Sequence, residues 1–248
     1  MKQTRRHFRL QIDSSIKRGG SLAVAGTGCT EPPPPHSLAM AAGERSTSGG
    51  SADRRRQILD AAIRVFAERG FHQCRVSDVA DEAGVAYGLV YHYFKSKEEI
   101  LNTLFLERWQ LMLDAIAEID ARDLPAREKL AQVAAFIVDS YRHDPNLMKV
   151  IIVEVTRSSH SFGARHLDKI QEAYDGIARI VERAQREGTF RNDIPADYGA
   201  LFFYGAIEQL LTAWIFAMLP PTEEEFERAK QLVVDALCSG LELEPARA

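Results

Sequence analysis

The sequence predicts an all-α protein in which a three-helix unit of residues 53–97 precedes a larger helical body of residues 98–243. From residue 53 onward, apolar residues recur at three- and four-residue steps, which places them on one face of each successive helix. The two-residue alternation of a half-buried strand appears in no segment. With 46% hydrophobic and 27% charged residues among 248, the composition fits a soluble globular chain and excludes collagen-like and disulfide-rich scaffolds.

The composition of residues 1–52 predicts that they form a disordered basic extension. They lack a sustained apolar period, contain the run Pro32–Pro35, and hold 7 Lys and Arg against 3 Asp and Glu. Residues 57–248 reverse this balance, with 21 basic against 31 acidic residues. Met40 is a plausible alternative start, so the sequence leaves open whether residues 1–52 belong to the native protein.

Sequence features that report on the compartment favour the cytoplasm. Residues 4–10 resemble a twin-arginine export address, but the apolar stretch that such a signal needs does not follow them. The 3 cysteines cannot all pair with one another, and no two have the Cys-x-x-Cys spacing. This cysteine usage fits a reducing compartment.

Residues 53–97 predict three short helices. The first carries an apolar stripe from Ile58 to Phe66 and ends at Gly70. The second begins at Ser77, which we expect to be its N-cap, and ends at Gly84. A third helix, residues 87–94, follows almost at once. Two helices joined by a tight glycine-containing turn form the helix-turn-helix, whose second helix lies in the major groove of DNA.

The order and spacing of these residues resemble the N-terminal domain of the tetracycline-repressor (TetR) family. The resemblance covers residues 54–101 without a gap and includes Gly70-Phe71-His72, Val76 to Val85, and Val90 to Leu101. It implies a helix-turn-helix DNA-binding domain followed by a helical ligand-binding and dimerisation domain. Tyr87 and Leu89 depart from the polar or small residues that many members carry there.

Candidate DNA contacts come from three sources. Three arginines at the positively polarised start of a helix are unfavourable, which favours a nearby anion such as the DNA backbone. Exposed aromatic residues and a leucine on the third helix indicate contact with bases, and the resemblance implies phosphate contacts by a serine and a lysine. The predicted residues are Arg54, Arg55, Arg56, Ser77, Ala86, Tyr87, Gly88, Leu89, Tyr91, His92, Tyr93 and Lys97. We expect Tyr87, Leu89, His92 and Tyr93 to read bases.

The apolar pattern of the body predicts six further helices. Ser96 and Glu99 form a capping box at the start of the first, which continues to about Ile119. The other expected elements are a helix from Leu124-Pro125 through Tyr141, a buried helix of residues 147–155, and helices of residues 164–186, 196–219 and 223–241.

The apolar run of residues 199–219 approaches the length of a membrane span. Glu208 and Gln209 lie near its centre, and a carboxylate there costs about 2.5–3.5 kcal/mol on insertion scales. We therefore expect no membrane partner. The resemblance instead implies that the last two helices pair with their copies in a homodimer, for which Trp214 is a candidate anchor.

The body carries no sequence signature of an enzyme. It lacks Gly-x-Ser-x-Gly, a phosphate loop and His-Glu-x-x-His, and His143, His160 and His166 are not at metal-ligand spacing. We therefore expect a non-enzymatic protein without a cofactor. Its aromatic and aliphatic residues are compatible with an ordinary core or with an apolar ligand cavity.

A second, weaker resemblance concerns the ligand. Phe71-His72-Gln73, Glu128-Lys129-Leu130, Asn146-Leu147 and Gly205 to Glu208 are similar to the fatty-acid-degradation repressors of the TetR family. The resemblance implies a double-stranded operator as partner and a small apolar effector of the long-chain acyl-CoA type. Candidate ligand contacts are Arg157, Arg165, Tyr141, Phe202 and Trp214, with the arginines holding phosphates. A chromosome-organising protein of the same fold remains an alternative to a ligand-released repressor.

Overall fold

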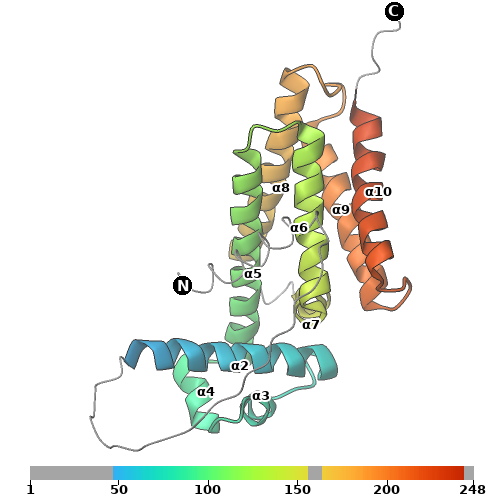
Figure 1. Cartoon of the computed structure of the whole chain (residues 1–248). Coiled ribbons are helices and arrows are strands. Elements are labelled where there is room, and N and C mark those ends of the chain that lie inside the picture. Colours follow the sequence, from blue (N-terminus) through green and yellow to red (C-terminus); the bar gives the residue numbers. More distant parts are fainter. Residues whose placement is uncertain (1–46, 156–163, 243–248) are drawn as a thin grey trace, which may run out of the picture. The chain divides into compact units, whose positions relative to one another are not determined.

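A computed structural model describes residues 47–155 and 164–242 of the chain. The described residues belong to one compact unit. The elements are α2 (Thr47–Arg69), α3 (Val76–Ala83), α4 (Tyr87–Tyr93), α5 (Lys97–Asp120), α6 (Ala126–His143), α7 (Pro145–Lys149), the π-helix η1 (Val150–Val155), α8 (Ala164–Arg186), α9 (Ala196–Ile215) and α10 (Glu223–Leu241) (Figure 1). The described residues contain no strand, so the predicted all-α class is confirmed.

Helices α2, α3 and α4 form a small layer, which we call the head (Figure 1). Its core is apolar and includes the fully buried Ile58, Val79 and Val90. Helix α2 starts at Thr47, six residues before the expected position 53, and residues 47–52 thus belong to it. The rest of the predicted extension, residues 1–46, lies outside the described residues.

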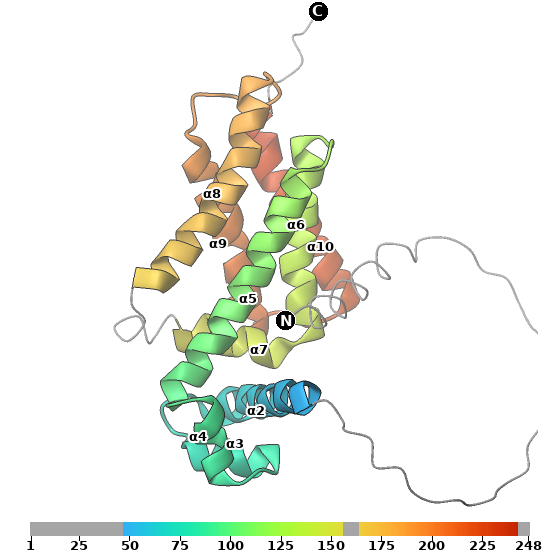
Figure 2. The same ribbon diagram turned by 90° about the vertical axis from the view of Figure 1, so that its left-hand side faces the viewer.

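Helix α5 leaves the head and runs into the body, where α6 and α8 pack against it, α9 packs against α8, and α10 packs against α6 and α9 (Figures 1 and 2). The Ser96 side chain accepts a hydrogen bond from the Glu99 N–H at 3.2 Å and caps the start of α5, as the sequence predicts. Gly176 on α8 allows a close approach to α5, because a Cβ there would lie 2.7 Å from the Ile116 side chain. A larger residue at position 176 would push these two helices apart.

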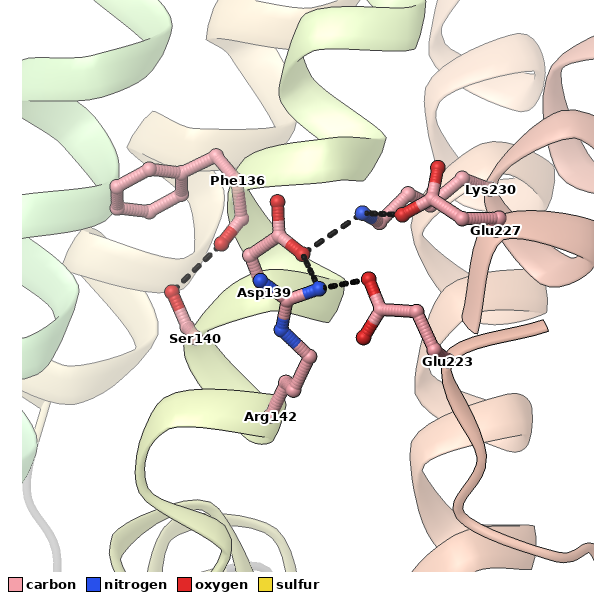
Figure 3. A network of polar contacts seen from close by, with 7 residues as sticks. All are labelled: Phe136, Asp139, Ser140, Arg142, Glu223, Glu227 and Lys230. Carbon is pink, nitrogen blue, oxygen red and sulfur yellow. Dashed lines mark hydrogen bonds and ion pairs between the residues drawn. The ribbon is translucent and has the colours of Figure 1, made fainter. Parts of the chain in front are cut away.

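A network of ion pairs fastens α10 to α6 (Figure 3). Lys230 on α10 lies 2.7 Å from the Asp139 carboxylate, and Arg142 on α6 pairs with Glu223 at the start of α10. At the other end of α6, Arg127 lies 2.6 Å from Asp235. One side of α10 therefore packs against α6.

Other expected helix boundaries also differ from the structure. The second helix has Arg75 instead of Ser77 as its N-cap and so begins at Val76, because the Asp78 carboxylate accepts a hydrogen bond from the Arg75 N–H at 2.7 Å. The expected helix of residues 147–155 is a short α7 followed by η1, and α7 starts at Pro145 because Asp144 caps it. Helix α9 ends at Ile215 instead of Leu219, since Ala217 adopts a left-handed φ of 54°.

No helix in the described ranges is long and apolar enough to cross a membrane. The burial of one side of α9 accounts for part of the apolar run that approaches membrane-span length. Ala200, Phe203, Ile207 and Leu211 of this helix are all buried in the protein core.

Candidate functional site

Helix α4 presents aromatic side chains on the outside of the head. Tyr87 is 53% exposed and Tyr91 is 42% exposed, and their hydroxyl oxygens are hydrogen-bonded at 3.1 Å. The two rings meet edge to face with centroids 5.0 Å apart. His92 is also exposed, whereas Leu89 and Tyr93 are half-buried. Large exposed aromatic side chains that gather on one short helix are typical of a partner-binding surface.

The opposite side of α4 is fixed in the core of the head. Val90 and Phe94 are buried there, and the turn before α4 is set by Gly84, whose φ of 63° ends α3. The Val85 N–H then donates to the Ala80 carbonyl at 3.0 Å. Helix α4 is therefore held as a rigid element, with the small and exposed Ala86 and Gly88 beside Tyr87.

The predicted arginine run divides into two groups. Arg55 pairs with Glu107 on α5 at 2.9 Å and lies over the Phe94 ring, 5.4 Å from its centroid, so it holds α2 against its neighbours. Arg54 and Arg56 remain exposed, and their nearest partners lie on α2 itself. Two of the three arginines thus present their charge to solvent.

Lys97 has a structural contact that the sequence did not predict. Its Nζ donates to the Phe71 carbonyl at 2.6 Å and the Cys74 carbonyl at 2.9 Å, and it lies 4.4 Å from the centroid of the Phe71 ring. Lysine has three donors, so one N–H is left beyond these two bonds. Ser77, half-buried, is the second residue of α3 and lies at the N-terminus of that helix.

Of the predicted ligand contacts of the body, the structure brings Tyr141 and Trp214 together and leaves Phe202 apart from them. Tyr141 and Trp214 are buried and stacked, with ring centroids 5.7 Å apart, and Phe226 packs on both rings. Phe202 is 71% exposed on the outer side of α9. Arg157 lies outside the described residues, as does the side chain of Arg165. Trp214 is therefore a core residue, and its predicted role as a dimer anchor is wrong because α6 and α10 cover it.

A buried arginine in the body escaped the sequence-based prediction. Arg108 on α5 is 7% exposed, and its guanidinium carbon lies 5.1 Å from the centroid of the Phe136 ring. The signal was present in the sequence, since position 108 follows Leu104 by four residues and precedes Met112 by four on the apolar side of α5. Burial lowers the pKa of Arg108 to about 10, which leaves the side chain charged at neutral pH.

The described residues contain no group of three or more His, Cys, Asp or Glu side chains that could hold a metal ion. The candidate sites of this part of the chain are thus the outer side of α4 and the interior of the body.

Two family models and several known proteins match the sequence of this chain. Residues 58–104 match the family described as "Bacterial regulatory proteins, tetR family", and residues 127–237 match "Tetracyclin repressor-like, C-terminal domain". The Fatty acid metabolism regulator protein of Bacillus subtilis is 33% identical over 163 residues, which cover 64% of this chain and 82% of that protein. The chain belongs to the TetR family. It is accordingly a transcriptional regulator with a helix-turn-helix, and it is related to regulators of fatty acid metabolism.

Solved structures of the TetR family agree with this fold. The transcriptional regulator FadR from Bacillus subtilis, solved in complex with stearoyl-CoA, superimposes with a TM-score of 0.63 and is 30% identical. The match covers 75% of this chain and 98% of that one. The fatty acid degradation regulator FadR from Bacillus halodurans gives a TM-score of 0.68 at 24% identity, over 75% of this chain and 95% of that one.

Proposed function

We propose that this TetR-family regulator is a cytoplasmic repressor that binds a palindromic operator as a homodimer and is released by a long-chain acyl-CoA. The observation that carries DNA binding is the outward position of Tyr87, Tyr91 and His92 on α4, whose inner side is fixed by Val90. In helix-turn-helix proteins the second helix of the motif enters the major groove, where base edges and thymine methyl groups are accessible.

The proposed contacts follow from these positions. Tyr87, Leu89, His92 and Tyr93 are assigned to base edges, with Tyr91 beside them at the phosphates. Ser77 and the remaining N–H of Lys97 are assigned to phosphates, because helix N-termini and ammonium groups both favour anions. Arg54 and Arg56 add exposed positive charge at the start of α2, whereas Arg55 is assigned to the head's own packing.

Operator affinity tests this assignment. The variant with both Tyr87→Ala and His92→Ala should bind the operator at least about thirtyfold more weakly, since each good base contact contributes about 1–3 kcal/mol and two are lost. Arg186→Ala, an exposed substitution on α8, is the matched control and should leave affinity unchanged. A mobility shift at fixed salt measures both. Equal affinity of the double variant and the wild type would exclude α4 as the reading helix.

An exposed apolar face supports the homodimer. Tyr198, Leu201 and Phe202 lie on the outer side of α9, and Leu232 is 58% exposed on α10. Gly205 and Ala206 continue the same region of α9 with small side chains that permit close approach of a second copy. Several large apolar side chains exposed on neighbouring helices favour a protein interface over solvent.

Sedimentation of Phe202→Glu tests the homodimer. The wild type should sediment as a dimer at micromolar concentration, and the variant should dissociate because a carboxylate would be buried at the interface. Leu167→Glu, on an exposed residue of α8, is the control and should remain dimeric. A wild-type monomer that still binds the palindrome tightly would contradict the dimer.

Relatives support the acyl-CoA effector, and the contacts between body and head suggest how it acts. Helix α2 contacts both α7 and η1, and Lys149 on α7 donates to the Ala67 carbonyl of α2 at 2.7 Å. A π-helix inside a helical region frequently marks a functional site. A ligand that shifts η1 would therefore shift α2 and change the spacing of the two heads on the operator.

Operator release with acyl-CoA of increasing chain length tests the effector. Release should strengthen with length, because burial contributes about 0.8 kcal/mol per CH₂ until the available space is full. Release should appear as a shift in operator affinity, since coupling between two sites is typically about 1–3 kcal/mol. If short and long acyl-CoA act equally, or neither acts at saturation, the effector is of another class while the DNA-binding proposal stands.

A further inference from the structure

Arg108 is a buried cation that forms no ion pair with a carboxylate of the described residues. It is 7% exposed, and its Nη1 is buried without a hydrogen-bond acceptor among the described residues. Buried arginines are almost always paired, because a buried charge without a partner is strongly destabilising. The second buried cation of the body, Lys129, is paired in this way. Its Nζ donates to the backbone carbonyl of Asp120 at 2.8 Å and lies 3.8 Å from the side-chain carboxylate of the same residue.

A second unpartnered donor lies next to Arg108. The indole Nε1 of Trp109, a residue that is 6% exposed, also has no acceptor in the described part of the chain. A tryptophan Nε1–H can only donate, and a guanidinium can only donate as well. Two donor nitrogens on adjacent buried residues, Nη1 of Arg108 and Nε1 of Trp109, thus lack an acceptor oxygen among the described residues.

Aromatic side chains from three other helices surround these donors. Phe136 on α6 lies under the guanidinium of Arg108, and its ring points away from the ion pairs that join α6 to α10 (Figure 3). Tyr204 on α9 lies 6.0 Å from the Trp109 ring and 5.3 Å from the ring of Tyr174 on α8, centroid to centroid. We call these five residues the Arg108 centre. It combines a fixed positive charge with apolar walls.

One acid lies near this centre without neutralising it. Glu208 is one turn beyond Tyr204 on α9, and its charge acts on Tyr174 and Tyr204. No ion pair joins it to Arg108, and burial raises the pKa of Glu208. The carboxylate is therefore poorly solvated itself and leaves the guanidinium without a counterion.

We propose that Arg108 and Trp109 bind the oxyanion of an acyl compound inside the body, either the carboxylate of a long-chain acid or a phosphate of its CoA ester. This inference rests on the proposed acyl effector and assigns the ligand's negative group to the middle of α5, instead of to Arg157 and Arg165. A carboxylate or phosphate supplies the acceptors that both donors lack, and the alkyl chain suits the aromatic walls. Binding then removes the uncompensated charge, so the ligand-bound body is the more stable one.

The test compares three probes that share one alkyl chain: palmitic acid, palmitoyl-CoA and hexadecanol. Their dissociation constants are measured by quenching of tryptophan fluorescence on the full chain, with Trp109 as a reporter inside the centre. Wild type should bind either palmitic acid or palmitoyl-CoA about tenfold or more tightly than hexadecanol, as expected for a hydrogen bond to a charged group. Tighter binding of palmitic acid would identify the oxyanion as the carboxylate, and tighter binding of palmitoyl-CoA would identify it as a phosphate of the CoA ester.

Arg108→Met should abolish this preference while leaving hexadecanol binding unchanged, and Arg186→Met is the matched control. Arg108→Lys keeps the positive charge and should keep part of the preference for the anionic probe over hexadecanol. This variant provides the measurement if Arg108→Met folds poorly. Equal wild-type affinity for all three probes, or an anion preference that survives in Arg108→Met, would overturn the Arg108 site alone. No binding of any probe by wild type at saturation would overturn the acyl effector together with it.

Discussion

The head and the body differ in where they keep their polar groups. Among the described residues, every buried polar or charged side chain lies in the body: Arg108, Lys129, Ser140 and His166. The head has an apolar interior and places its aromatic and charged residues outside, on α4 and the start of α2. The comparison teaches that the two regions follow different packing rules, since the head excludes polar side chains from its core and the body encloses several of them.

Phe66→Ala should have the largest effect on stability and tests the apolar interior of the head. Phe66 is fully buried, so the cavity and lost burial should lower the free energy of unfolding by about 3–5 kcal/mol. Tyr87→Ala on the outer side is the control and should lower operator affinity with almost no change in melting temperature. Chemical denaturation measures the first effect. A small loss for Phe66→Ala would mean that the head is loosely packed.

The two buried cations of the body should respond in opposite ways to neutral substitution. Lys129→Met removes one of the two donors to the Asp120 carbonyl and leaves only Arg183 Nη1 at 3.3 Å, so it should lower the free energy of unfolding by about 1–2 kcal/mol. Arg108→Met removes an uncompensated charge and should leave stability without ligand unchanged or slightly higher. Thermal melts of both variants in the absence of ligand provide the comparison. Equal destabilisation would indicate that Arg108 serves the fold.

Lys97→Ala should combine a structural and a functional effect of intermediate size. Loss of two bonds to carbonyl oxygens should lower the free energy of unfolding by about 1–2 kcal/mol. Operator binding should weaken for all DNA sequences alike, with a salt dependence shallower by about one unit. Melts and mobility shifts at several salt concentrations separate the two effects. An unchanged salt dependence would restrict Lys97 to a structural role.

Glu208 should produce the smallest effect, visible as a pH dependence. Because burial raises its pKa in the folded chain, the unfolded chain loses this proton first. Its contribution to stability is therefore most favourable below the ordinary pKa of 4.5 and diminishes as pH rises through the raised value. Glu208→Gln should flatten this part of the stability profile. An identical profile in the variant would mean that Glu208 is well solvated.

The sequence predicted the helical elements well, α4 among them, because they depend on local patterns. Apolar spacing, the Ser96 cap and the glycine turns act within a few residues, and they sufficed for α5, α8 and α10. The family resemblance was confirmed along most of the chain. The predicted contacts of α4 with DNA stay a prediction, although the helix has the expected outward position.

Tertiary structure alone decided which side of each helix meets a neighbour. Phe202 and Phe203 are adjacent in the sequence, yet the first is exposed and the second is buried against other helices. Arg54 and Arg108 are both arginines within helices, but only Arg108 lies where residues of α6 and α9 enclose it. Such environments arise from segments about thirty to one hundred residues away, so local spacing could not reveal them. The sequence by itself determined the helices and the family, and the packing of distant helices placed a charge in the interior of the body.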